Sequence, residues 1–205
     1  METSQNQFDY PYADLSIECP EKSDRLVAFF RIFMVLPVLF LFVLIVGFQS
    51  EECAVAGGGF LFLPILLSIV FRYKYPRVWF DWVLYLTKFM ARITAYLFLL
   101  RDEYPAIEDE QQVKLTLRYP DTAAELHRGM PLVKWFLDIP HYIVLMFLFV
   151  AVLFVTLFAW FSILFTGKYP PEMHRFTVSV FRWSLRVDAY AFLLLTDRYP
   201  PFQLN

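Results

Sequence analysis

The residues best suited to chemistry in this sequence are basic side chains spaced four positions apart. Lys88 and Arg92 lie four apart in one apolar segment, and Arg182 and Arg186 repeat this spacing beside Trp183 near the C-terminus. On a helix, residues with this spacing share one face. Cations beside a tryptophan can bind anionic lipid headgroups or an acidic surface of a partner protein. Simple anchoring of the helix at a membrane surface is the alternative, and it is the interpretation that we favour.

Two further polar residues lie in apolar surroundings. His141 follows Pro140 at the start of a long apolar run, and neither of the other histidines has metal-ligand spacing from it. We therefore expect a hydrogen-bonded structural histidine. Asp188 lies on the same predicted helix as Arg186, and a charge in such a segment is normally paired. We expect it to form a structural ion pair with Arg92 or Arg186 rather than to act in catalysis.

Motifs for catalysis, metal binding and phosphate binding are absent from the sequence. It contains no GxSxG, HExxH, Walker-type or Rossmann pattern. Its two cysteines exclude a disulfide framework and a four-thiolate metal site. The formal net charge is -2, so a strongly basic surface for nucleic acid is excluded too. We predict a protein that is not an enzyme, holds no cofactor or metal and binds no nucleic acid.

Long apolar segments must position these residues. Hydrophobic residues make up 59% of the 205 positions, whereas a soluble domain contains roughly 45–50%. The run from Tyr142 to Thr166 has no formally charged residue, and an apolar run of that length is solvated by lipid. Residues 1–18 are polar and acidic and lack the basic region and cleavage site of a signal peptide. The first apolar segment is therefore expected to direct membrane insertion.

The order of segments predicts two copies of one unit. Each copy contains a short strand of alternating apolar residues, an apolar region, a Tyr-Pro turn, a helix with a polar stripe and a Tyr-Pro end. Matching segments recur in the same order at a nearly constant spacing: LSIECP with LTLRYP, FFRIFMVLP with LVKWFLDIP, KFMARITAYLFLL with RWSLRVDAYAFLL, and DEYPAI with DRYPPF. Such ordered matches are rare in unrelated apolar sequence.

The fold expected from this pattern is an all-α membrane protein of two tandem repeats. Each repeat would contain an apolar helical hairpin and an amphipathic helix at the membrane interface, with short strands outside the membrane. The parts are an N-terminal extramembrane segment, a first membrane repeat, an extramembrane linker and a second membrane repeat: residues 1–24, 25–107, 108–127 and 128–205.

The apolar region of the second copy allows two topologies. Positive charges near both ends of each apolar region favour hairpins whose ends face the cytoplasm. Residues 148–155, however, contain no glycine, proline or polar turn residue, so one long span over 140–166 is the competing topology, with the striped helix as the return span. A charge at the bilayer centre costs roughly 2.5 kcal/mol or more. We therefore expect the striped helices to lie in the interface.

The second copy resembles a known family. Its segments PLVKWFLDIPHYIVL, AWFSILFTGKYPPEMHRF and RWSLRVDAYAFLLLTDRYPPF are similar to the bacterial membrane family called domain of unknown function 4389, over nearly all of residues 128–205. The first copy is a divergent version, with Val38 where the second has His141. The resemblance implies membrane residence and a repeat unit, and it implies no mechanism.

These features predict a non-enzymatic integral membrane protein that acts as an interaction or accessory subunit of a membrane assembly. Its partners would be the lipid bilayer and either another membrane protein or a second copy of itself. A small transporter or lipid-handling protein is the alternative, but the predicted hairpins carry almost no ionisable residues for a translocation path. The expected location is the bacterial cytoplasmic (inner) membrane, with several membrane passes and both termini in the cytoplasm.

Overall fold

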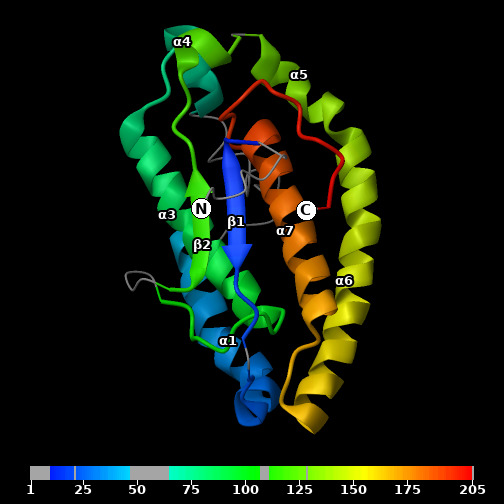
Figure 1. Ribbon diagram of the computed structural model, residues 1–205. Helices are drawn as coiled ribbons and strands as arrows, with labels where there is room; N and C mark the ends of the chain where they lie inside the picture. Colours follow the sequence, from blue (N-terminus) through cyan, green and yellow to red (C-terminus); the bar gives the residue numbers. More distant parts are fainter. Residues whose placement is uncertain (1–9, 21, 47–64, 107–110, 128, 205) are drawn as a thin grey trace, which may run out of the picture.

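The computed structural model describes residues 10–20, 22–46, 65–106, 111–127 and 129–204. The chain is mostly helical and has one two-stranded sheet (Figure 1), as the sequence predicts. In chain order the elements are β1 (Ala13–Ile17), α1 (Arg25–Val46), the π-helical segment η2 (Ser68–Arg72), α3 (Arg77–Leu97), β2 (Val113–Leu117), α4 (Thr122–Glu125), α5 (Met130–Leu137), α6 (Ile139–Thr166) and α7 (Pro171–Ala191).

The two strands form an antiparallel ribbon that joins the halves of the chain. Leu15 pairs with Leu115 at its centre, the positions that the sequence comparison aligns. The strands alternate as their sequences predict, with leucines facing inward and Asp14, Ser16 and Lys114 facing outward. The ribbon therefore has an apolar inner face and a charged outer face.

The inner face of the ribbon covers two long helices. β1 packs on α7, and β2 packs on α3, so each strand lies on the striped helix of the other half. Both helices contain 21 residues and both begin directly after a Tyr-Pro pair, whose proline is the N-cap. α7 lies between β1 and α6 and buries most of its residues there (Figure 1). It is thus a core helix, rather than one with an aromatic face left free to enter lipid.

Residues 139–166 form one continuous helix, so the predicted hairpin of the second copy is wrong. The run lacks a residue that could terminate it, and α6 ends only at Gly167, whose φ of 72° is left-handed. The Gly167 N–H donates to the Ile163 carbonyl at 2.8 Å. With 28 residues, α6 is about 42 Å long at 1.5 Å per residue.

The apolar region of the first copy is described only in part. α1 continues through Pro37 without a break in its assignment, and the chain is described again from Ile65 into η2. The predicted loop at 49–59 lies outside the described residues. The hairpin of the first copy therefore stays a prediction.

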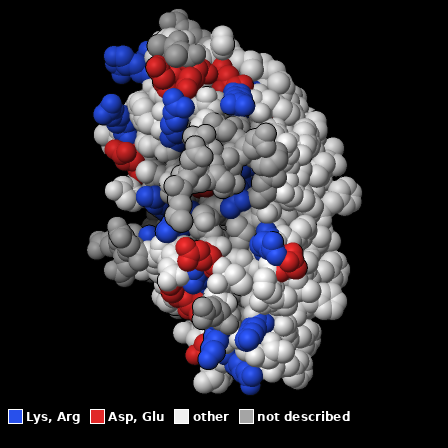
Figure 2. Space-filling model, in the orientation of Figure 1, with Lys and Arg blue, Asp and Glu red and all other residues white. Residues whose placement is uncertain are grey.

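One side of the molecule is almost entirely apolar. In the described part of the chain, α6 alone is long and apolar enough to cross a membrane, and little of its most apolar stretch is buried. Large exposed side chains continue onto α1 and α5. In Figure 2 the side over α6 is almost entirely white, whereas charged residues lie on the opposite side and near the ends of the molecule. The fold thus separates an apolar side from a charged one.

Candidate functional site

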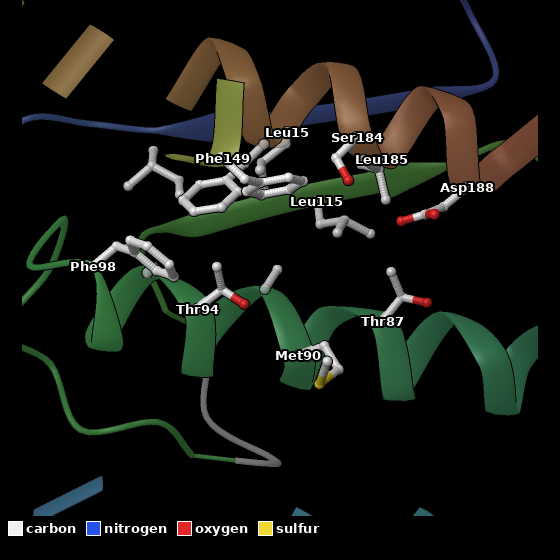
Figure 3. A pocket seen from close by; sticks show the side chains of 14 residues that line it. Leu15, Thr87, Met90, Thr94, Phe98, Leu115, Phe149, Ser184, Leu185 and Asp188 are labelled. Carbon is white, nitrogen blue, oxygen red and sulfur yellow. The ribbon is translucent and has the colours of Figure 1, made fainter. Parts of the chain in front are cut away.

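A cavity of about 330 Å³ lies between α3 and α7, beneath the ribbon (Figure 3). Its walls are mainly apolar and come from both halves of the chain: Leu15, Leu115, Phe98, Phe149 and Phe181. The volume is at the lower end of the roughly 300–1,000 Å³ typical of ligand pockets. Because residues of both halves line this space, the cavity is a product of the way the halves pack.

Polar groups lie along the two helices that border the cavity. Thr87 and Thr94 come from α3, and Ser184 and Asp188 come from α7. In Figure 3, Asp188 and Thr87 lie toward one end, and Phe98 and Phe149 toward the other. The Thr87 hydroxyl donates to the Val83 carbonyl of its own helix at 2.8 Å. Among the described residues that line the cavity, Asp188 is the one with an ionisable side chain.

The ion pair predicted for Asp188 is not formed. Arg92 donates instead from Nη1 to the Ala106 carbonyl at 2.5 Å, and the charges that act on Arg186 are those of Arg182, Asp14 and Tyr10. Burial raises the pKa of Asp188 from 3.8 to about 7. A carboxyl group without a compensating cation keeps its proton more tightly in such surroundings. Sequence reasoning identified Asp188 but assigned it the wrong neighbours.

A fully buried carboxyl group lies near Asp188. Asp138, between α5 and α6, is fully buried, and neither of its oxygens has a hydrogen-bond partner. Its pKa is raised from 3.8 to about 7, chiefly by burial and then by the nearby Asp188, while Lys134 opposes the rise. The electrostatic effect of Asp188 on Asp138 places the two carboxyl groups in one acidic region. Asp138 follows Lys134 by four residues, the spacing that predicts an ordinary helix ion pair, but Lys134 pairs with Asp197 instead.

The amino group of Lys134 is held away from these carboxyl groups. Its Nζ donates to the Thr196 carbonyl at 2.7 Å and lies 2.8 Å from Asp197 Oδ1. It also lies 4.9 Å from the centroid of the Tyr190 ring. Burial lowers the pKa of Lys134, and Asp197 opposes that effect. Lys134 therefore fixes the C-terminal segment to α5.

The first half contains the corresponding arrangement. Arg31 Nη1 donates to the Tyr96 carbonyl at 2.5 Å, the guanidinium forms an ion pair with Asp102, and its Cζ lies 4.5 Å from the centroid of the Tyr96 ring. These three residues align with Lys134, Tyr190 and Asp197 in the sequence comparison. The alignment of DEYP with DRYP was the available signal for both ion pairs.

The remaining residues of the predicted site are dispersed. Arg182 Nε donates to the Leu15 carbonyl at 2.7 Å and lies 3.1 Å from Asp14 Oδ1. Arg186 is buried, and Lys88 is half-buried on α3. These positions do not gather the four cations into one patch. Binding of lipid headgroups by Lys88, Arg92, Arg182, Trp183 and Arg186 stays a prediction.

His141 and Trp183 form a buried pair. The indole N–H of Trp183 donates to His141 Nδ1 at 3.2 Å. The imidazole ring stacks on Phe202, with centroids 3.8 Å apart and planes at 15°. These contacts fit the structural role predicted for His141.

Comparison with known families finds a match in the second half. The model of the family described as "Domain of unknown function (DUF4389)" matches residues 131–203. The matched stretch contains α6, α7, both members of the His141–Trp183 pair and Asp188. Searches of curated proteins and of solved structures give no match. The resemblance of the second copy to this family is therefore confirmed.

Proposed function

We propose that this chain is a non-enzymatic accessory subunit of a membrane assembly, with its apolar side in lipid and its ribbon side against a partner. The observation that carries the proposal is the position of the charged ribbon beside the middle of the apolar helix α6. The proposal includes two tandem repeats, each an apolar region followed by a striped helix.

The apolar side has the chemistry of a surface in lipid. Phe147, Phe154 and Phe158 are all at least 60% exposed along α6, and exposed apolar residues continue on α5. Monomeric soluble proteins rarely expose an apolar surface that continues over several helices. Lipid contact removes the cost of hydrating this surface.

The ribbon lies at the depth of the middle of α6. Arg182, near the middle of α7, binds the β1 backbone at Leu15. The neighbouring Phe181 ring lies 6.0 Å from that of Phe149, well inside α6. If α6 crosses a bilayer, the outward-facing Asp14 and Lys114 therefore lie at bilayer depth. Each such charge costs roughly 2.5–3.5 kcal/mol next to lipid, so a polar partner must cover the ribbon. Another membrane protein or a second copy of this chain would cover it.

The bacterial cytoplasmic membrane is the proposed location, with both termini on the cytoplasmic side. The long apolar helix α6 supports a location in a membrane. The Tyr10 hydroxyl donates to the Arg198 carbonyl at 3.2 Å, so the two ends of the described chain lie together. Trp160 Nε1 donates to the Ala28 carbonyl at 3.1 Å, which places the start of α1 beside the end of α6. The two apolar helices thus run in opposite directions, as in a multi-pass protein.

Site-specific photocrosslinking in intact cells tests this proposal. A photoreactive residue at Ser16 or Thr116, on the outer face of the ribbon, should give a discrete protein adduct. The same residue at Phe154 of α6 should give lipid adducts, which makes it the matched control. An adduct of twice the mass of the chain would identify a second copy as the partner.

Absence of protein adducts at both ribbon positions, with ready labelling of a cysteine there by an impermeant reagent, would contradict the proposal. The chain would then lie along the membrane surface with its ribbon in water.

A lipid-handling protein is the second candidate function, and the cavity is the observation that favours it. The cavity is lined by both halves and contains an unpaired carboxyl group, as expected of a binding site rather than of a packing defect. Uptake of a fluorescent lipid by purified protein, lost when the cavity is filled, would support this function.

A further inference from the structure

We propose that the cavity between α3 and α7 binds an amphiphilic molecule with an apolar chain and a protonated amine, and that Asp188 pairs with the amine. The inference goes beyond the proposed accessory function and does not depend on it. It rests on the shape and lining of the cavity, on the lack of a partner for Asp188, and on the second buried carboxyl group nearby.

The lining separates an apolar end from a polar end. Phe98 and Phe149 lie toward one end, and Asp188 and Thr87 toward the other (Figure 3). A ligand that fills this space must be apolar over most of its length, because a buried polar group without a hydrogen-bond partner is costly. At its other end it must satisfy a carboxyl group. The cavity therefore selects an amphiphile rather than a pure hydrocarbon.

The polar end has carboxyl groups without a matching cation. Asp188 forms no ion pair with a described residue, and the fully buried oxygens of Asp138 have no hydrogen-bond partner. Lys134, the cation that acts on Asp138, is bound to Asp197 and Thr196. An anionic headgroup would add a third negative charge to this region. A cationic headgroup would supply the missing charge and several hydrogen-bond donors.

The ionisation of Asp188 and of the ligand amine makes the affinity depend on pH. A primary ammonium group remains charged up to a pH of roughly 10.4, whereas burial raises the pKa of Asp188 to about 7. Asp188 acts electrostatically on Asp138 and Tyr142, and Lys134 acts on Asp138. Affinity for the amine should therefore rise as the pH increases through about 7, because ionised Asp188 is the form that pairs. An uncharged ligand of the same length should bind with little pH dependence.

The alignment of the two halves provides a rescue variant. Thr94 of α3 occupies the position aligned with Asp188 of α7, and both residues line the cavity. The substitution Thr94→Asp in a chain that also carries Asp188→Asn returns one carboxyl group to the same cavity from the opposite wall. A merely structural role of Asp188 in α7 would not be restored by this change.

Binding of decylamine, decanol and decanoate to the purified full-length chain in lipid nanodiscs tests the proposal. The three probes have the same chain length and differ in the charge of the headgroup, and empty nanodiscs correct for partition into lipid. Decylamine should bind at least about tenfold more tightly than either other probe at pH 8. Asp188→Asn should reduce its affinity to that of decanol, since a buried cation is then left unpaired. Thr94→Asp with Asp188→Asn should restore the preference for the amine.

Two further variants keep the result decisive. Ala91→Phe, which places a large ring in the cavity wall, should weaken binding of all three probes. Asp81→Asn, on the exposed face of α3, should leave all three affinities unchanged. The proposal is overturned if decanol or decanoate binds as tightly as decylamine, or if the amine preference survives in Asp188→Asn. If Asp188→Asn fails to fold, the unaltered chain provides the test. Its affinity for decylamine should rise between pH 6 and pH 8, and a constant affinity overturns the proposal. Photocrosslinking at the ribbon does not depend on ligand binding in the cavity, so it tests the accessory function separately.

Discussion

The two halves of the chain fill corresponding positions with different chemistry. In the first half, Val38 and Phe89 belong to one apolar cluster. The aligned residues of the second half are His141 and Trp183, which are joined by a hydrogen bond. Phe89 and Trp183 both lie on striped helices, 94 positions apart. The same packing position thus accepts an apolar contact in one half and a polar pair in the other.

A similar difference applies at the cavity. Thr94 in the first half corresponds to Asp188 in the second. The stretch that matches the family model is the half with the histidine, the tryptophan and the carboxyl group. The ion pair of a buried cation with the aspartate of the Asp-x-Tyr-Pro segment is common to both halves. We infer that the shared ion pair holds the architecture and that the polar residues particular to the second half are the better candidates for ligand binding.

The largest expected effect comes from removing the shared ion pair. Asp197→Ala should lower the free energy of unfolding by about 3–5 kcal/mol, because it leaves Lys134 as a buried charge without its partner. Asp102→Ala should cost less. Lys134 and Asp197 have side chains 0% and 11% exposed, whereas those of Arg31 and Asp102 are 3% and 23% exposed, and a guanidinium is less strongly hydrated than an ammonium. Unfolding in mixed detergent micelles gives both values.

The matched control for these two variants is an exposed pair. Arg175 and Glu172 form an ion pair on the surface of α7, and both side chains are largely exposed. Glu172→Ala should change the free energy of unfolding by no more than roughly 0.5 kcal/mol. Equal losses in Asp102→Ala and Asp197→Ala would contradict the proposed difference between the halves. A negligible loss in both would show that neither ion pair stabilises the fold.

The histidine–tryptophan pair gives a second, smaller effect. His141→Val should cost about 1–3 kcal/mol, since it leaves the buried Trp183 N–H without an acceptor. Trp183→Phe should cost a similar amount, through the lost hydrogen bond and lost volume. The double variant recreates the valine–phenylalanine pair of the first half. Its cost should be about 1 kcal/mol less than the sum of the single costs. Additive losses would mean that the two side chains do not act as a pair.

The sequence was sufficient for the elements that depend on local pattern. Alternating residues around Leu15 and Leu115 predict the strands, and the Tyr-Pro turns predict where α3 and α7 begin. The hairpin predicted for the second copy is wrong because the distribution of positive charge indicates a turn, whereas residues 148–155 contain none of the residues that form one. Helix α6 is continuous through this stretch, since no residue in it interrupts the backbone hydrogen bonds.

Contacts between distant segments could not be predicted in the same way. Asp188 was expected beside an arginine because a charge in an apolar helix is normally paired. Which face of α7 meets α3 depends on the antiparallel pairing of β1 with β2, which the sequence match did not determine. That pairing directs Asp188 into the cavity and Arg182 toward β1. The candidate site is therefore a consequence of how the halves are joined.

The last expected effect is a pH dependence that belongs to the second half. The pKa of Asp188 is about 7 in the folded chain and 3.8 ordinarily, so folding favours its protonated form. This residue contributes stability that is fully present below pH 3.8 and is lost as the pH rises through about 7. Asp188→Asn should make the free energy of unfolding fall less steeply between pH 5 and 8. Some slope should remain, because burial also raises the pKa of Asp138 to about 7. Thr94→Asp in the unaltered background should steepen the slope, since it adds a second acidic group to the cavity. Denaturation curves at a series of pH values measure all three slopes, and an unchanged slope in Asp188→Asn would remove this distinction between the halves.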